Sequence, residues 1–389
     1  MSTLRNKLEL RYGKTITFAA ECNELAAHIY QTIGIQISAQ TLRRILGFIQ
    51  DGSKPSKRIL KSLEEYCGLT HAAQLDNNIP TDFSAAELDH LALLKNFYNI
   101  NLSLGYDFNY HKACGNIAKS IIGNPRYLIN LSKFLTSNEV SQIYFFERFP
   151  YIDGICTDYK IHFMRYVKAK QTTEAQLFGN NILFLGAFLS NNVQEMDLYL
   201  AKINALPISS NFHPFPQARK VMSNLLYHFW TDNKAQLAYW TTQAFVEEKK
   251  QLRGNTPSAH FPFFQFTLAD AFNIVGDFVA AKQMIDIAEL EYKRYDNGMV
   301  ELGYFECFDM VKAITLYHLG NKRDSKRILD RIEPANFIFI QQNYFLIQLK
   351  HLQLNMCTTD KSIKYKKLKK EQDDLIAKTR FTYFENALK

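Results

Sequence analysis

Helical periodicity runs through almost the whole chain and restricts its fold more than any other feature. Apolar residues recur at the three- and four-residue spacing of a helix face, as at Cys22, Leu25 and Ile29, and the pattern resumes beyond residue 84. With 16 Gly and 10 Pro in 389 residues, turn-forming residues are too few for a β-rich fold. The length exceeds that of a usual single domain. The sequence therefore predicts an all-α protein with several cores or an extended stack of helices.

Three helical segments are expected within the first seventy residues. The first ends near Gly34, the second runs from an N-cap at Ser38 to Gly47, and the third follows Pro55-Ser56 and ends near Gly68. Their apolar stripes are expected to share one small core, formed by Phe18, Cys22, Leu25, Ile29 and Ile33, by Leu42, Ile45, Leu46 and Ile49, and by Ile59, Leu60, Leu63, Tyr66 and Cys67.

A domain boundary is expected near residue 80. Residues 77–82 are polar and contain a proline, which is typical of a linker. The next helix then opens with a capping box, Ser84 to Glu87, and an apolar stripe of Leu88, Leu91 and Leu94. We predict a small helical domain over 1–75, a linker over 76–83 and a second helical domain over 84–389.

Internal repetition is the most informative feature of the second domain. In two stretches a helix ends at a glycine, Gly276 or Gly320, with a small residue five positions later and an aliphatic residue nine positions later. The small residues are Ala281 and Ser325, and the aliphatic residues are Ile285 and Leu329. Two further turns, at 190–192 and 231–233, continue the series at intervals of 41, 45 and 44 residues. The pattern predicts a row of helix hairpins.

This pattern resembles degenerate tetratricopeptide repeats over residues 262–333, and more loosely over 150–262. The resemblance implies an α-solenoid of helix hairpins (TPR-like). A plain helical bundle is the alternative, because any helix hairpin can place glycine at its turn.

The middle helix of the first domain carries polar residues of the types that read DNA bases. At 100° per residue, Gln40, Arg43 and Arg44 are directed away from the apolar face that centres on Leu42, and Thr41 lies at its edge. Arg bonds guanine bidentately, Gln bonds adenine, and Thr contacts a thymine methyl group or a phosphate.

Basic residues are enriched in the same region. Residues 1–71 hold ten Lys and Arg against six Asp and Glu, a net charge of +4 out of the chain's +8. Lys54, Lys57 and Arg58 lie around the start of the third helix, where cations and backbone N–H groups suit phosphate contact.

The segment Ile37–Gly47, followed by Lys54-Pro55-Ser56 and Leu60–Gly68, resembles the Xre or lambda-repressor-like helix-turn-helix family. The resemblance implies a transcriptional regulator that binds double-stranded DNA, and a homodimer is expected because one short helix reads few bases. The predicted DNA-binding residues are Ser38, Gln40, Thr41, Arg43, Arg44, Lys54, Lys57 and Arg58. The alternative is a small helical cap on a protein-interaction scaffold, with its arginines merely solvated.

The order of the two domains is similar to that of peptide-sensing transcription regulators, whose repeat domain binds a peptide and mediates dimerisation. This likeness implies a peptide or protein partner at the repeats, clamped by Asn180, Asn181, Asn224 and Asn273. Alternatively, these asparagines cap turns or face solvent.

No enzyme chemistry is predicted. Gly13-Lys14-Thr15 imitates the end of a P-loop, but Leu8 stands where the first glycine is required, and no other catalytic motif is present. The six cysteines lie far apart, so neither a disulfide framework nor a metal site is expected, and no cofactor is predicted. The chain has no membrane-length apolar run, and a cytoplasmic location is expected. The aromatic segments 144–151 and 261–266 are interpreted first as core and loop anchors, and the lysine-rich run 361–370 as a solvated helix face.

Overall fold

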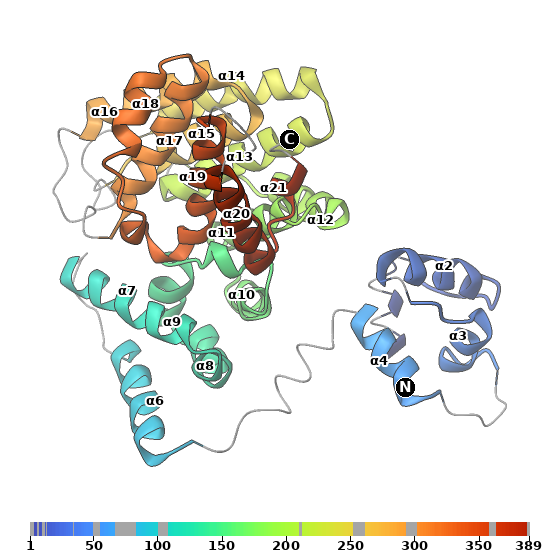
Figure 1. Cartoon of the computed structure of the whole chain (residues 1–389). Coiled ribbons are helices and arrows are strands. Elements are labelled where there is room, and N and C mark those ends of the chain that lie inside the picture. Colours follow the sequence, from blue (N-terminus) through green and yellow to red (C-terminus); the bar gives the residue numbers. More distant parts are fainter. Residues whose placement is uncertain are drawn as a thin grey trace. The chain divides into compact units, whose positions relative to one another are not determined.

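A computed structural model of the chain shows helices joined by turns and short irregular segments over the described residues (Figure 1). These are residues 4–5, 8–9, 12, 14–33, 35–49, 55–66, 83–99, 108–209, 212–251, 261–292, 302–357 and 363–386. Among them there is no β-strand, which confirms the all-α class. No helix in these ranges is long and apolar enough to cross a membrane. The chain divides into two compact units, Met1–Phe83 and Ser84–Lys389.

The N-terminal unit contains α2 (Glu21–Ile33), α3 (Ala39–Ile45) and α4 (Lys57–Tyr66), which pack around one core. Its buried members confirm the centre of each predicted stripe: Cys22, Leu25 and Ile29 from α2, Leu42 and Leu46 from α3 and its end, and Leu63 and Tyr66 from α4. Leu8 and Ile16, which belong to none of those stripes, are also fully buried in it. Gly34, Cys67 and Gly68 lie outside the described residues.

The prediction that Phe18 belongs to this core is wrong. Its side chain is 70% exposed because α2 begins only at Glu21. The backbone N–H groups of Thr17 and Phe18 donate to the Glu21 carboxylate at 2.8 and 2.9 Å, so residue 18 lies in a turn before the helix. The helical spacing was extended one turn too far toward the N-terminus.

The C-terminal unit opens with α6 (Ala85–Tyr98) and the predicted capping box, in which Ser84 and Glu87 bond each other's backbone N–H groups. Leu91 and Leu94 are buried as expected, whereas Leu88 is 53% exposed and does not belong to the stripe. The following elements are α7 (Phe108–Gly123), α8 (Pro125–Ser137), α9 (Glu139–Ser141), the π-helical η1 (Gln142–Glu147), the short η2 (Ile152–Gly154) and α10 (Tyr159–Ala169).

Consecutive pairs of helices make up the rest of this unit. The pairs are α11 (Thr173–Leu189) with α12 (Val193–Ala205), α13 (Pro214–Trp230) with α14 (Lys234–Lys250), α15 (Phe263–Val275) with α16 (Phe278–Tyr292), α17 (Tyr304–His318) with α18 (Lys322–Leu329), and α19 (Gln342–Asn355) with α20 (Ile363–Thr379). The first helix of each pair packs against the first helix of the next, and each second helix packs on its own partner.

Four turns inside these pairs share one backbone design. A single residue of positive φ ends the first helix, and the Asn or Asp that follows caps the second helix with its side chain. The positive-φ residues are Asn191, Asp232, Gly276 and Gly320, with φ of 55°, 50°, 80° and 87°. In each turn the next residue donates its N–H to the carbonyl five residues earlier, at 2.8 or 2.9 Å. The predicted turns are confirmed, and these four positions lie 41, 44 and 44 residues apart.

The small residues after the two glycines are buried, as their positions predict. Ala281 and Ser325 are both fully buried, and the Ser325 hydroxyl donates to the Ala313 carbonyl of the paired helix at 2.7 Å. Ile285 is buried as well, but Leu329 is only half-buried because Ile328 takes the interior position in α18.

The last helices pack against η2 and α11, which come much earlier in the sequence. Asp153 in η2 accepts the backbone N–H groups of Asn343 and Tyr344 at 2.6 and 3.0 Å, which caps the start of α19. The short α21 (Tyr383–Asn386) packs on α11, where the rings of Phe188 and Tyr383 lie 4.5 Å apart. Contacts across some 190 residues therefore join the C-terminal helices to η2 and α11.

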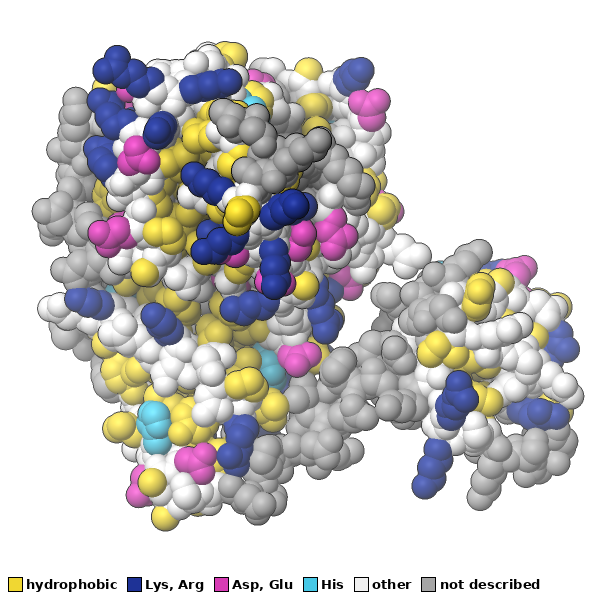
Figure 2. Space-filling view, in the orientation of Figure 1, with side chains coloured by type: hydrophobic (Ala, Val, Ile, Leu, Met, Phe, Trp, Pro, Cys, Tyr) yellow, Lys and Arg dark blue, Asp and Glu magenta, His cyan; other side chains and the backbone are white. Residues whose placement is uncertain are grey.

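The lysine-rich run forms a solvated face of α20. Leu368 and Ile376 are buried, while Lys366, Lys367 and Lys370 are exposed. Figure 2 shows basic side chains spread over this face of the C-terminal unit with acidic ones among them.

Candidate functional site

The helix α3 is held in place at both ends and along one side. The Ser38 hydroxyl accepts the backbone N–H of Thr41 at 3.2 Å, so Ser38 is the predicted N-cap. Gly47, with φ of 84°, lets the chain leave the helix. Leu42 and Leu46 anchor the helix in the core. This short helix therefore presents its remaining side chains from a fixed position.

The other predicted contact residues lie at the surface of the same unit. Gln40 is exposed on α3, and Arg44 is half-buried beside it. Lys57 and Arg58 are exposed in the first turn of α4, which the Ser56 hydroxyl caps at the Ile59 N–H. Ser38 is exposed and Thr41 half-buried, whereas Lys54 lies outside the described residues.

Arg43 differs from these residues, because its guanidinium turns back to α2. Its Nε donates to the Ala19 carbonyl at 2.9 Å, and one Nη donates to the Asn23 side chain at 3.3 Å. The guanidinium thus joins α3 to the start of α2. This tie sets the angle between the two helices and uses donors that bidentate guanine recognition needs.

We expect Arg43→Ala to lower the free energy of unfolding of the N-terminal unit by about 1.5 kcal/mol, because two charge-assisted hydrogen bonds are lost from a half-buried site. Arg58→Ala, at an exposed position, is the matched control and is expected to change stability by less than about 0.5 kcal/mol. Hydrogen–deuterium exchange of the α2 amides in the full chain measures both. Equal exchange in the two variants would show that the Arg43 tie is energetically unimportant.

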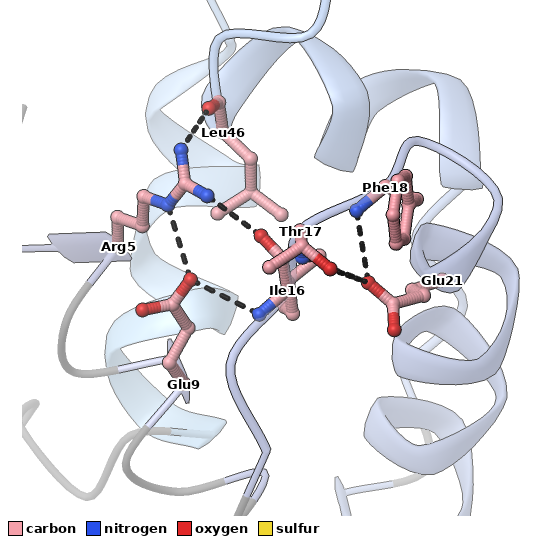
Figure 3. A network of polar contacts seen from close by, with 7 residues as sticks. All are labelled: Arg5, Glu9, Ile16, Thr17, Phe18, Glu21 and Leu46. Carbon is pink, nitrogen blue, oxygen red and sulfur yellow. Dashed lines mark hydrogen bonds and ion pairs between the residues drawn. The ribbon is translucent and has the colours of Figure 1, made fainter.

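A second set of hydrogen bonds joins α3 to the N-terminal segment around Arg5, which is not among the predicted site residues. Arg5 donates to the Leu46 carbonyl at 3.2 Å, to the Ile16 carbonyl at 2.6 Å and to Glu9 at 3.1 Å (Figure 3). Its guanidinium also lies 5.4 Å from the ring centre of Phe48. Arg5 therefore holds the end of α3 to the segment that precedes α2. The i,i+4 spacing of Arg5 and Glu9 is the only sequence signal of this network.

Glu21 fixes the beginning of α2. Its carboxylate accepts the N–H groups of Phe18 and Thr17 (Figure 3). It also pairs with Lys14 at 3.2 Å. These bonds favour the charged form, the backbone N–H groups most, and lower the pKa of Glu21 to about 2. The anchor therefore stays ionised at neutral pH.

The four asparagines proposed to clamp a peptide are bonded within the C-terminal unit. Asn181 donates to the Pro216 carbonyl at 3.3 Å and accepts from the Ser223 hydroxyl at 2.9 Å, so it joins α11 to α13. Asn273 joins α15 to α17 in the same way, through Val311 at 2.9 Å and Thr315 at 2.8 Å.

The other two asparagines are also buried and engaged. Asn224 pairs with Asn204 at 3.1 Å, and Asn180 donates to the Gln176 carbonyl of its own helix at 2.7 Å. In this structure the amides of all four residues serve contacts within and between helices, and the peptide clamp stays a prediction. The asparagines stand out in the sequence, but a sequence alone does not distinguish a residue in a binding groove from one in an interhelical contact.

Within the described ranges, no group of three His, Cys, Asp or Glu residues is placed to hold a metal ion. Five cysteines there are free thiols, at positions 22, 114, 156, 307 and 357. The described residues that were predicted to bind DNA lie together on the surface around α3 and the start of α4, and this surface is the candidate site. Comparisons of the chain with protein-family models, with curated proteins and with solved structures found no match.

Proposed function

We propose that the chain is a non-enzymatic, DNA-binding transcriptional regulator. The observation that carries the proposal is the position of α3, whose ends are fixed by Ser38 and Gly47 while Gln40 and Arg44 lie on the side opposite Leu42. A polar helix face of this kind, held on a small core, fits the major groove in the manner of a helix-turn-helix.

Phosphate contacts would come from the neighbouring helix start. Lys57 and Arg58 are exposed in the first turn of α4, and Lys54 precedes them in the sequence. Such contacts set the register on DNA without reading its sequence. In this arrangement Arg43 is a positioning residue, because it holds α3 against α2.

The C-terminal unit is proposed to be a TPR-like α-solenoid that senses a peptide or protein partner or assembles the regulator. Four helix pairs with the same turn, each stacked on the next through its first helix, support the repeat interpretation. A homodimer is part of the proposal, since one seven-residue helix covers too few base pairs for specificity.

The test is a binding titration of the full chain against a random DNA duplex pool, followed by the selected sequences at several salt concentrations. We expect Arg44→Ala or Gln40→Ala to weaken specific binding by about 1–3 kcal/mol and to relax the preference at one position. Lys57→Ala and Arg58→Ala should each reduce the slope of log binding constant against log salt concentration by about 1, whatever the DNA sequence.

Arg327→Ala in α18 is the control, because this arginine is 71% exposed on the other unit. Arg43→Ala is unsuitable as a contact test, since its loss disturbs the helix pair itself. Absence of binding at low salt, or binding that none of the four N-terminal variants alters, would reject the proposal.

A helical-repeat interaction scaffold without DNA binding is the second candidate. The inward bonds of Arg43 favour it, because they remove one of two arginines from the reading face. The same titration separates the candidates: a scaffold shows no sequence preference and no dependence on Arg44.

A further inference from the structure

A cavity of about 330 Å³ lies inside the C-terminal unit, at the end where α11, α13, α15 and α17 begin. Its wall includes five aromatic side chains from four successive first helices, Phe178, Phe215, Phe263, Phe266 and Tyr304. The volume is at the lower end of the range for small-molecule sites, and an apolar wall with a few polar groups is typical of them.

A buried cation in this wall makes no hydrogen bond to a carboxylate among the described residues, although the charge of the nearby Asp270 favours its charged form. Arg219 of α13 is only 7% exposed, and its guanidinium lies 4.8 Å from the ring centre of Phe215. Among the described residues, its Nε has no hydrogen-bond partner, and one Nη contacts only the Met222 sulfur at 3.4 Å. The nearby Asp270 carboxylate bonds Tyr344 at 2.8 Å and Gln348 at 3.4 Å instead. A buried guanidinium with unmade hydrogen bonds costs free energy of folding unless a ligand accepts those bonds.

A second donor faces the cavity from the start of α13. The Nδ1 of His213 accepts the Phe215 N–H at 3.2 Å, which assigns the ring proton to Nε2. This Nε2 is buried with no partner among the described residues. Burial and the charge of Arg148 lower the pKa of His213 to about 3, so the ring is neutral and Nε2 donates.

The acidic side chains of the wall are already occupied. Glu147 pairs with Lys170 at 2.5 Å and accepts the Tyr166 hydroxyl at 2.7 Å. Glu174 accepts the backbone N–H of His213 at 2.7 Å. The lining also contains Arg148, Lys170 and Arg219, so its own side chains carry one positive charge in excess, and outside the lining the charge of Asp270 acts on Arg219.

The helix arrangement adds to this positive field. Four helices point their N-termini at the cavity, and the positive end of a helix dipole favours an anion. Within the described residues, α15 and α17 begin without a side-chain cap, at Pro262 and Gly303. The unpaired atoms of Arg219 and His213 in the described part of the wall are thus both donors.

We propose that this cavity binds a small organic monoanion, an aromatic carboxylate. Its carboxylate would bond Arg219 and His213, with Arg148 near, and its ring would pack among Phe178, Phe215 and Phe263. A monoanion suits the single excess charge better than a dianionic phosphate does. The proposal does not depend on DNA binding by the N-terminal unit, and it gives the C-terminal unit a ligand of stated chemistry.

The test is isothermal titration calorimetry of the full chain with phenylacetate, 4-hydroxybenzoate and indole-3-acetate. The corresponding amides are the neutral counterparts, and phenyl phosphate is the dianion. We expect at least one carboxylate to bind, its amide to bind at least about tenfold more weakly, and phenyl phosphate to bind more weakly than the carboxylate. Absence of binding by all three carboxylates, equal binding of the amide, or tighter binding of phenyl phosphate overturns the proposal.

Variants then locate the site. Arg219→Met retains the apolar stem and should weaken the carboxylate at least about tenfold, and its folding is checked by tryptophan fluorescence. Arg148→Gln, at a half-buried position, keeps the test decisive if Arg219→Met fails to fold, and should also weaken binding. Arg327→Gln is the matched control on α18 and should leave affinity unchanged. If Arg219→Met folds and binds the carboxylate with full affinity, the ligand lies elsewhere and the proposal is contradicted. If only Arg148→Gln folds, full affinity in that variant contradicts the proposal in the same way.

Discussion

Gly303→Ala is expected to destabilise the C-terminal unit by about 4 kcal/mol. The backbone at Gly303 has φ of 81°, a conformation that costs an L-residue about 1–2 kcal/mol. A Cβ there would also lie 1.9 Å from the Asn336 carbonyl oxygen and 2.7 Å from the Ile338 nitrogen. These are backbone atoms, so the clash requires the chain to shift and adds about 1–3 kcal/mol.

Gly276→Ala is the matched control for this effect. Gly276 has φ of 80°, almost the same backbone conformation, but a Cβ there meets nothing within 4 Å. We expect a loss of only about 1 kcal/mol from the left-handed conformation. Urea denaturation of the full chain, followed by tryptophan fluorescence, measures both variants, because Trp230 and Trp240 are the two tryptophans of the chain and lie in the C-terminal unit. Similar losses in the two variants would show that the close approach at Gly303 carries no cost.

Asp153→Ala is the second substitution with a large expected effect, a loss of about 3 kcal/mol from the same unit. The Asp153 carboxylate is almost fully buried and caps α19 through the N–H groups of Asn343 and Tyr344. Alanine leaves both donors without a partner at the junction of distant segments, and each buried donor left this way costs about 1–3 kcal/mol. The same fluorescence-detected urea denaturation measures the loss.

Asp153→Asn separates the hydrogen bonds from the charge. Burial raises the pKa of Asp153 from 3.8 to about 7 against the opposing effect of its two N–H donors. The folded chain therefore holds a proton that the unfolded chain releases above pH 3.8. The stability due to that proton is fully present below pH 3.8 and is lost as the pH rises through about 7.

We expect Asp153→Asn to lose less stability than Asp153→Ala, because asparagine keeps a hydrogen-bond acceptor. We also expect its free energy of unfolding to fall less between pH 4 and 7 than that of the natural chain. Some fall remains, because burial raises the pKa of Asp270 to about 6 with the same sign. An unchanged pH profile in Asp153→Asn would assign the pH dependence to other groups.

Local features of the fold could be predicted from the sequence wherever neighbouring residues determine them. The four turns were found because a residue that tolerates positive φ, followed by an Asn or Asp cap, is a local signal. The capping box at Ser84 was found for the same reason. Phe18 and Leu88 were misplaced because periodicity cannot tell where a helix begins or which of its apolar positions has a neighbouring helix to cover it.

Long-range contacts of the sites could not be predicted in this way. Arg43 and Arg44 look equivalent in the sequence, yet only the packing of α3 on α2 brings the Ala19 carbonyl to the Arg43 guanidinium. Arg219 gave no signal, since its burial depends on helices far away along the chain. The aromatic segment 261–266 was interpreted as a core anchor, and Phe263 and Phe266 prove to line the cavity as well.

The short turns inside the helix pairs tolerate changes in length less than the connections between the pairs do. One inserted or deleted residue at Asn191, Asp232, Gly276 or Gly320 would displace the capping residue and rotate the next helix, so these connections admit no change in length. The connections between pairs, 206–213, 251–262, 293–303 and 330–341, are longer in the sequence. Described residues at or directly after their ends line the cavity, among them His213, Phe263 and Tyr304. Substitutions at these described positions would change the wall of the cavity while the stacking of the helices stays as it is, so ligand preference can vary without a change of fold.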